Sequence, residues 1–400
     1  TKEYDNMVAN PNIPKKVIKA RDLEEQISKL QQESGYPYVI NIDTANRVNP
    51  ISGKIVMSNL CSEILQVQRA SVINNRQEYE VLGTDISCNL GSTNIVNLMA
   101  SPNFGKSVEV MTRALTFVTD KSDIDVVPSI QHGNRLAHTI GLGAMGLHAY
   151  LAKNQIEYGS PEALEFTSVY FMLLNYSTLV ASNKIAKERK VTFDNFENSK
   201  YADGSYFDTY LNQEFAPKNA RVKELFDGIF IPTKSDWTSL KENVIKYGLY
   251  HQNRLAVAPN GSISYINDTT ASLHPIINRI EERQERKIGK IYYPAPYLSN
   301  ETLPYYKSAY DTDMRKVIDT YAAAQQHVDQ GMSLTLFMRS TIPAGLYEWK
   351  NGRTDKMTTR DLSILRNYAH YKGVKSIYYV RTFTDDASEV GANECESCSI

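Results

Sequence analysis

The spacing of hydrophobic residues changes from segment to segment along the 400-residue chain, and it predicts a mixed α/β protein. Some stretches repeat apolar residues every three to four positions, as amphipathic helices do, and others are short apolar runs typical of buried strands. The predicted helices are residues 14–33, 104–119, 139–153, 161–188, 236–247, 312–326 and 359–371. The predicted strands or extended segments are residues 38–42, 58–64, 86–92, 254–258, 333–338 and 376–380. Strands alternating with helices indicate crossover connections and a parallel sheet or barrel.

Three stretches lack a clear period and are predicted to be irregular. Residues 43–49 form a polar loop, residues 192–234 an irregular excursion, and residues 383–400 a mobile tail. Residues 141–146 spell G-x-G-x-x-G, the dinucleotide-binding fingerprint. Because they fall within a predicted helix, without a clear preceding strand, we interpret these glycines as sites of close helix packing.

Composition narrows the class of protein. Hydrophobic residues make up 42% of the chain, charged residues 22%, and the net charge is −1. This balance argues against a nucleic-acid binder, which normally presents a basic surface. No apolar run approaches the roughly 20 residues that span a bilayer. Four cysteines are too few for a secreted disulfide scaffold, so we expect a cytoplasmic protein in a reducing compartment.

The segment 58–64 carries the most unusual combination of side chains. Asn59, Cys61 and Glu63 alternate within an apolar run, so in an extended conformation all three would share one face. That face would combine an amide, a redox-capable sulfur and a proton acceptor, a set that is costly to bury without partners or a ligand. The alternative is a half-buried strand with an inert core cysteine.

The other cysteines occupy two different settings. Cys88 lies in the extended segment 86–92, and Cys395 and Cys398 form a C-x-x-C in the predicted tail. Such a pair can be half of a zinc site, with Cys61 and Cys88 as the other half, or a thiol–disulfide exchange pair. Exchange suits a mobile terminus better, because it needs an accessible thiolate that can travel to its partner.

Two further motifs are weaker. Residues 258–264, Ala-Pro-Asn-Gly-Ser-Ile-Ser, follow a predicted strand, and free N–H groups at the start of a following helix would favour a phosphate. The alternative is an ordinary strand-to-helix turn. Tyr378 and Tyr379 are adjacent in a predicted strand, where aromatic residues are common in any case.

Together these motifs resemble the large, catalytic subunit of class I ribonucleotide reductase, most closely class Ib. The resemblance rests on Asn59–Glu63, Cys88, the 258–264 loop, the Tyr378–Tyr379 pair and the C-x-x-C, which occur in the family's order. It covers essentially the whole chain. The fold it implies is the second half of a ten-stranded α/β barrel made of two five-stranded parallel halves. Residues 1–50 would complete the first half, residues 51–382 would hold the finger loop and second half, and residues 383–400 would be a redox tail.

The resemblance also implies roles for individual residues. Cys61 resembles the thiyl-radical cysteine that abstracts the ribose 3′ hydrogen. Glu63 resembles the base for the 3′ hydroxyl, and Asn59 the amide that orients the ribose. Cys88 resembles one half of the dithiol that reduces the 2′ carbon; the family's other half lies upstream.

The remaining motifs would serve substrate binding and electron transfer. Tyr378 and Tyr379 resemble a radical relay, and Cys395 and Cys398 a shuttle that re-reduces the active-site disulfide. No metal site is expected in this chain. The implied substrate-binding residues are Asn59, Leu60, Cys61, Ser62, Glu63, Pro259, Asn260, Gly261, Ser262, Ile263 and Ser264.

The implied partners follow from this chemistry. They are a ribonucleoside diphosphate, a small subunit with a dinuclear metal centre and tyrosyl radical, a thioredoxin- or glutaredoxin-like reductant, and a second large subunit in a dimer. No cofactor is expected on this chain, and nucleotide effectors are expected on upstream regions. We therefore expect the C-terminal catalytic portion of a ribonucleoside-diphosphate reductase large subunit. The alternatives are a fragment active only when docked with an N-terminal portion, and a simple C-x-x-C thiol oxidoreductase.

Overall fold

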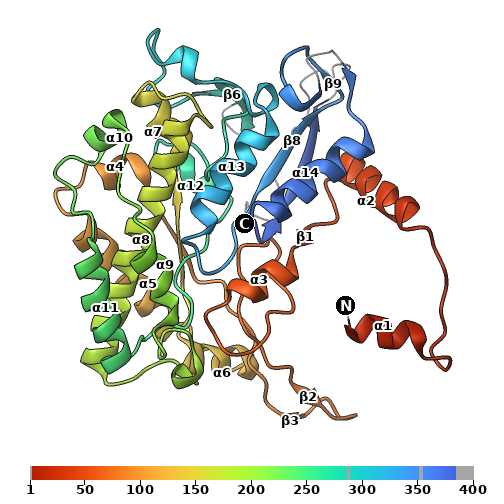
Figure 1. The fold of residues 1–400 in the computed structure, drawn as a ribbon, viewed down its shortest axis with the longest axis vertical. Coiled ribbons are helices and arrows are strands. Elements are labelled where there is room, and N and C mark those ends of the chain that lie inside the picture. Colours follow the sequence, from red (N-terminus) through yellow and green to blue (C-terminus); the bar gives the residue numbers. More distant parts are fainter. Residues whose placement is uncertain (1, 286–288, 351–354, 384–400) are drawn as a thin grey trace.

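The computed structural model describes residues 2–285, 289–350 and 355–383 and contains helices and strands in alternation, which confirms an α/β protein (Figure 1). The α-helices are α1 (Lys2–Ala9), α2 (Ala20–Ser34), α3 (Ile42–Val48), α4 (Ile95–Met99), α5 (Phe104–Lys121), α6 (Pro128–Ala137), α7 (Leu147–Lys153), α8 (Pro161–Arg189), α9 (Asp208–Asn212), α10 (Ala220–Leu225), α11 (Lys234–Tyr247), α12 (Gly261–Ile266), α13 (Met314–Gln325) and α14 (Thr359–Tyr371). The strands are β1 (Val39–Ile40), β2 (Val72–Ile73), β3 (Tyr79–Val81), β4 (Leu90–Asn94), β5 (Gly141–Met145), β6 (Ile280–Glu285), β7 (Gly289–Pro294), β8 (Thr335–Arg339), β9 (Thr341–Ile342), β10 (Asp355–Lys356), β11 (Ser376–Ile377) and β12 (Tyr379–Phe383).

Parallel pairings connect five segments in series. Strand β4 pairs with β5, and β8 pairs with β12, both in parallel. Residues 254–258 lie between these pairs, because Leu255 forms a parallel bridge with Leu142, and Val257 forms one with Met332. The predicted strand at 254–258 is therefore attached by isolated bridges, without a continuous ladder. In the part of the chain that the structure describes, the series does not close into a complete barrel.

The predicted helix at 139–153 is wrong over its first half. Residues 141–145 form the fully buried strand β5, and only α7 is helical. A Cβ on Gly143 would lie 2.3 Å from the carbonyl oxygen of Ala256, so this glycine lets the neighbouring segment approach. The G-x-G-x-x-G glycines thus serve close strand packing and a turn into α7, where Gly146 has φ 88°. The helical interpretation failed because a short apolar run has no diagnostic period.

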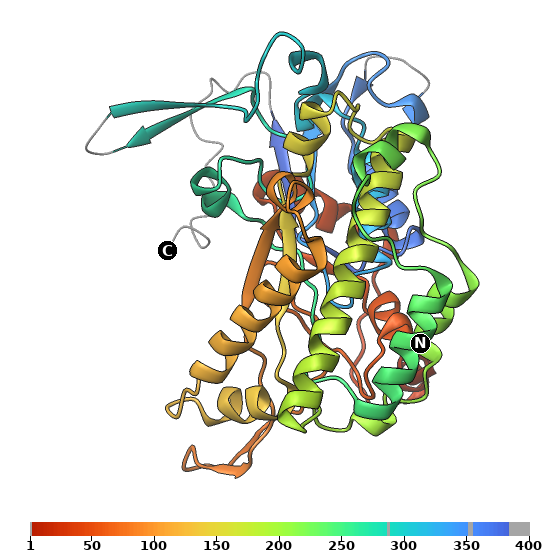
Figure 2. The same ribbon diagram turned by 90° about the vertical axis from the view of Figure 1, so that its left-hand side faces the viewer.

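The long helix α8 packs one side of this parallel series and contacts α5, α11 and α13 (Figures 1 and 2). Its start is confirmed where the sequence predicts it, since the Ser160 side chain accepts a hydrogen bond from the Ala163 N–H and Pro161 occupies the first turn. Buried residues run along most of its length, as expected for a helix inside the main core. None of the described helices is long and apolar enough to cross a membrane.

The N-terminal region differs from the prediction in two ways. Helix α2 starts at Ala20, and it buries a polar face: Arg366 of α14 donates to Ser28 and Gln31, while Leu23 and Leu30 stay about half exposed. The predicted loop at 43–49 is instead helix α3, whose buried Ala45 packs against Ile55 and Leu65. Tertiary packing overrides the polar composition of this short helix.

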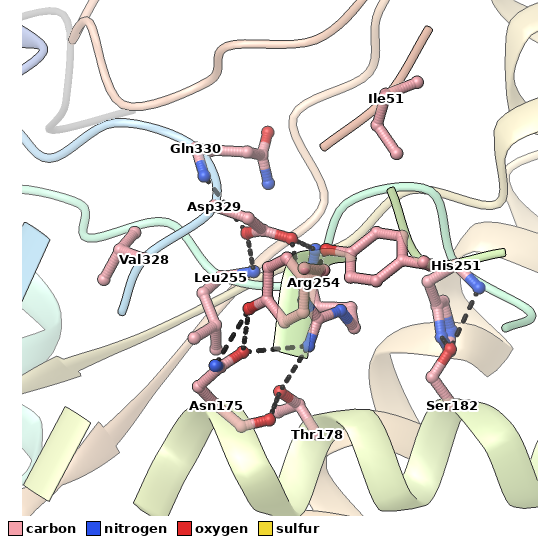
Figure 3. Close-up of polar contacts among 12 residues, drawn as sticks. Ile51, Asn175, Thr178, Ser182, His251, Arg254, Leu255, Val328, Asp329 and Gln330 are labelled. Atoms are coloured by element: carbon pink, nitrogen blue, oxygen red, sulfur yellow. Dashed lines mark hydrogen bonds and ion pairs between the residues drawn. The ribbon is translucent and has the colours of Figure 1, made fainter. Parts of the chain in front are cut away.

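A buried ion pair joins the starts of two of the parallel segments (Figure 3). The Arg254 guanidinium lies 3.4 Å from the Asp329 carboxylate, and it donates to Asn175 of α8 and to the Tyr201 hydroxyl. Asp329 also accepts from the backbone N–H groups of Arg254 and Leu255, at 2.9 and 2.8 Å. Because every partner is buried, this network aligns the segments that carry the candidate site.

Candidate active site around Cys61

The segment carrying Cys61 is a tight loop, so the predicted extended conformation is wrong. Ser62 has φ 67°, and its N–H donates to the Asn59 carbonyl at 3.2 Å. The Asn59 side-chain oxygen accepts from the Ile64 N–H at 3.0 Å. Asn59 therefore closes the loop on itself, an option that asparagine side chains offer and that alternation along a strand does not capture. We call residues 59–63 the finger tip.

Three successive carbonyls attach the finger tip to the rest of the protein. The Cys61 carbonyl accepts from the Ser333 hydroxyl at 2.6 Å. The Ser62 carbonyl accepts from the Ser376 hydroxyl at 2.8 Å, and the Glu63 carbonyl accepts from the Gly331 N–H at 2.8 Å. The tip is thus held against the starts of β8 and β11, through side-chain contacts 272 and 314 residues farther along the chain.

The structure brings three of the predicted site residues into direct contact. The Asn59 amide donates to Glu63 Oε1 at 2.9 Å and lies 3.7 Å from Cys88 Sγ. The Cys88 thiol donates to the same Glu63 oxygen at 3.9 Å, a normal reach for sulfur. Cys61, two residues from Glu63, is buried, and Cys88 is exposed. An amide, a thiol and a carboxylate therefore meet at the finger tip.

Burial controls the ionisation of Glu63, a residue that is only 1% exposed. Burial raises the pKa of Glu63, and donation from Asn59, Ser333 and Cys88 partly offsets this rise. A carboxylate with a raised pKa is a better proton acceptor near neutral pH. Glu63 is therefore a candidate proton acceptor at the finger tip.

The predicted phosphate loop lies at the other end of the segment that carries Cys88. The Ser92 hydroxyl, on β4, donates to the Asn260 side chain at 2.9 Å, and Asn260 takes φ 58° at the start of α12. Ser92 lies four positions after Cys88, a span of at most roughly 13 Å for extended backbone. Gly261 faces open space, and the buried Ser264 hydroxyl donates to the Gly261 carbonyl at 2.8 Å. Ser264 therefore supports the loop, whereas residues 261–263 remain accessible.

The adjacent tyrosines belong to a cluster of four aromatic rings. Tyr378 is buried, and its ring lies 5.7 Å from that of Tyr379 and 4.8 Å from that of Tyr38. Tyr36, about half exposed, lies 4.9 Å from Tyr38 and 5.6 Å from Tyr379. These spacings are those of packed aromatic pairs, so the cluster links the protein surface to a buried ring.

Several sequence-predicted residues have other placements. Leu60 is about half exposed, and Ser62 is buried against the Ser376 contact. Cys395 and Cys398 lie outside the described residues. Three residues that hold the finger tip, Gly331, Ser333 and Ser376, were not predicted from the sequence. Their only signal was a position at, or two residues before, the start of a predicted strand.

Gly331→Ala is expected to dislodge the finger tip. An added Cβ would lie 2.7 Å from the Ser62 carbonyl oxygen, which is backbone and cannot move aside cheaply. We expect a loss of stability of about 1–3 kcal/mol and faster alkylation of Cys61, measured by urea unfolding and mass spectrometry. Gly261→Ala, where a Cβ meets open space, is the control. An unchanged alkylation rate in Gly331→Ala would contradict this attachment of the tip.

Comparison with known proteins identifies the family of this chain. A family model described as "Ribonucleotide reductase, barrel domain" matches residues 1–380. The ribonucleoside-diphosphate reductase subunit alpha of Bacillus subtilis is 45% identical, covering 99% of this chain and 54% of that protein. The subunit of the same name from Mycoplasma pneumoniae is 44% identical, covering 100% of this chain and 55% of its own length. The chain spans about half the length of these relatives. The match over residues 1–380 shows that this chain belongs to the ribonucleotide reductase family.

Proposed function

We propose that the chain is the C-terminal catalytic portion of a ribonucleoside-diphosphate reductase large subunit, most like class Ib. The observation that carries the proposal is the contact of Asn59, Glu63 and Cys88 beside Cys61 at the attached finger tip. The family membership and the 44–45% identity to alpha subunits support the same activity. The reaction would replace the 2′ hydroxyl of a ribonucleotide by hydrogen.

The proposed steps use the finger tip directly. A thiyl radical on Cys61 takes the hydrogen from the ribose 3′ carbon, leaving a thiol and a carbon radical. Glu63 accepts the 3′ hydroxyl proton, and Asn59 orients the ribose. The 2′ hydroxyl takes a proton from one thiol of a pair formed by Cys88 and a second cysteine, and it leaves as water. The pair then supplies two electrons and its second proton to the 2′ carbon and closes to a disulfide, and Glu63 gives its proton back to the 3′ oxygen. Cys61 then returns its hydrogen to the 3′ carbon and becomes a radical again.

The buried position of Cys61 supports the first step, because a thiyl radical needs a site from which competing reactants are excluded. The raised pKa of Glu63 supports the second step, because a base is most effective when its pKa lies closer to the working pH. The loop at residues 259–264 would receive the diphosphate at the accessible start of α12, whose first N–H groups have no acceptor within the helix.

Electron transfer would use the remaining motifs. Tyr379 and Tyr378 would relay an oxidising equivalent from a small subunit that carries the dinuclear metal centre and tyrosyl radical. The four-ring cluster supports this route, since it leads from the half-exposed Tyr36 to the buried Tyr378. Cys395 and Cys398 would re-reduce the active-site disulfide and be reduced in turn by a thioredoxin- or glutaredoxin-like protein.

The proposed architecture is the second half of a ten-stranded barrel, with residues 1–50 belonging to the first half and residues 383–400 to the redox tail. Support comes from the five parallel segments in series and from the finger tip attached at their starts. The chain covers 54% of its Bacillus relative, and the second reducing thiol is expected upstream of Cys88 in the family. We therefore propose that turnover requires an N-terminal large-subunit portion, in an assembly that is dimeric when complete and regulated by nucleotides bound upstream.

Reconstitution tests the proposal. The 400-residue chain is assayed for reduction of ribonucleoside diphosphates with dithiothreitol and a class Ib small subunit, with and without an N-terminal large-subunit fragment. We expect deoxyribonucleotide only when the fragment is present. Complex formation is measured in parallel by light scattering. A confirmed complex that forms no deoxyribonucleotide would overturn the proposed activity.

A further inference from the structure

The Ser333 hydroxyl contacts both the backbone of Cys61 and the carboxylate of Glu63, two residues with different roles in the proposed reaction. It lies 2.6 Å from the carbonyl oxygen of Cys61 and 3.0 Å from Glu63 Oε2. Ser333 is 1% exposed, so water does not compete freely for these contacts. Its backbone N–H donates to the Val257 carbonyl at 2.9 Å, which anchors the residue to the neighbouring parallel segment. The hydroxyl is therefore held in place between the radical-bearing residue and the base.

A hydroxyl has one proton and two acceptor lone pairs, so it can donate to only one of these oxygens at a time. When Glu63 is ionised, its carboxylate is the stronger acceptor and attracts the proton of Ser333. When Glu63 is protonated, it can donate to the Ser333 oxygen, and the Ser333 proton is then directed at the Cys61 carbonyl. Both arrangements use the same heavy-atom positions.

The two oxygens of Glu63 are not equivalent, and this asymmetry selects the oxygen that takes up the proton. Oε1 accepts from the Asn59 amide at 2.9 Å and from the Cys88 thiol at 3.9 Å. Oε2 faces Ser333. Ser333 can turn its proton to the Cys61 carbonyl and accept from Oε2 instead, whereas the Asn59 amide can only donate to Oε1, so an added proton is placed on Oε2.

We propose that Ser333 is a positioning residue that couples proton uptake by Glu63 to the hold on the Cys61 backbone through its single hydroxyl proton. The inference rests on the proposed function for its catalytic consequence, but the coupling itself is a property of this chain. Each time Glu63 takes a proton from a substrate hydroxyl, the Ser333 hydroxyl turns toward Cys61 and steadies the residue that must return its hydrogen.

The surroundings of Glu63 give Ser333 a large influence on the ionisation of its carboxyl group. In the described part of the chain, the Glu63 carboxylate contacts the Asn59 amide, the Ser333 hydroxyl and the Cys88 thiol. The Lys375 amine, in the segment that also carries Ser376, is directed at the carbonyls of residues 328–330. Burial and neutral donors, without a charged partner, therefore set the ionisation of Glu63.

Ser376 provides a matched control. It is as buried as Ser333 and donates to the next carbonyl of the finger tip, that of Ser62, at 2.8 Å. In the described part of the chain, its hydroxyl donates to the carbonyls of Ser62 and Met332 and not to the Glu63 carboxylate. Loss of its hydroxyl should loosen the tip as much as loss of the Ser333 hydroxyl, without altering the ionisation of Glu63.

The experiment is an infrared pH titration of the full chain, following the protonated-carboxyl band that Glu63→Gln removes. In Ser333→Ala the pKa of Glu63 should rise by about one to two units, since a hydrogen bond to a charged group contributes roughly that much. Ser333→Cys, which fills the same space with a weak donor, should also raise it. Ser333→Thr, which keeps the hydroxyl, and Ser376→Ala should both leave it at the wild-type value.

A reconstituted reductase supplies a second readout. Because the ionised form of Glu63 acts as the base, a raised pKa should move the acid limb of kcat/KM to higher pH in Ser333→Ala and leave it in place in Ser376→Ala. If Ser333 had only a structural role, kcat/KM would fall by the same factor in Ser333→Ala and Ser376→Ala at every pH. An unshifted infrared titration in Ser333→Ala and Ser333→Cys overturns the coupling while leaving the reductase proposal intact. A shifted titration with no reductase activity in the wild-type complex overturns the proposed function alone.

Discussion

Cys61→Ser should abolish deoxyribonucleotide formation in the reconstituted complex while the chain stays folded. A serine hydroxyl fills nearly the same buried volume. Its O–H bond is stronger than the S–H bond of cysteine, so a tyrosine relay cannot remove the hydrogen atom and no radical forms at residue 61. The loss should reach the assay background, because without this hydrogen abstraction no later step can occur. The free energy of unfolding, measured with denaturant, should change by less than about 1.5 kcal/mol, as for other volume-conserving core substitutions.

Substrate tritiated at the 3′ carbon separates the roles of the two cysteines. A fraction of the tritium transferred to Cys61 should exchange with water before it is returned to the 3′ carbon, so the wild-type complex should release some tritium and Cys61→Ser should release none. Cys88→Ser should still release tritium, because hydrogen abstraction precedes the reduction step that needs Cys88. Normal turnover in Cys61→Ser would refute the radical role. Disulfide reduction that survives in this variant without any nucleotide reduction would favour the simple thiol oxidoreductase.

Asp329→Ala should destabilise the chain by about 3–5 kcal/mol, the cost of removing one partner from a buried ion pair. The Arg254 side chain is completely buried, so its guanidinium would lose its carboxylate with no access to water. The backbone N–H groups of Arg254 and Leu255 would lose their acceptor as well. Because these groups begin one of the parallel segments, their loss should also weaken the hydrogen bonds that attach the finger tip.

Urea unfolding measures this effect, and two variants serve as controls. Asp311→Ala removes the carboxylate of an ion pair with Arg339 that is half exposed on the Asp311 side, so its cost should stay below about 1 kcal/mol. The double variant Arg254→Met with Asp329→Leu should recover much of the lost stability, since it leaves no uncompensated charge. Equal losses in Asp329→Ala and Asp311→Ala would show that the buried network is not a major source of stability.

Much of the organisation of this protein is determined by local sequence. Helix α8 begins at its predicted cap because Ser160 and Pro161 satisfy the helix start without outside help. Helices α5, α13 and α14 follow the apolar period, which reflects burial of one face. The family, the ordered motifs and the candidate residues Asn59, Cys61, Glu63 and Cys88 were also readable, because each motif lies within a few consecutive residues.

Tertiary structure alone decided how these residues meet. The finger tip is a closed loop, although its alternating side chains suggested a strand, because Asn59 satisfies the loop's own backbone and distant groups hold its carbonyls. Strand β5 likewise depends on Leu255, far away in sequence, and helix α3 depends on Ile55 and Leu65, which lie outside its own segment. Gly331, Ser333 and Ser376 carry no local signature of their role, since an ordinary glycine or serine becomes specific only when folding places it against the finger tip. Periodicity reports which face is buried, but a hydrogen bond across 270 residues is set by the packing of the whole chain.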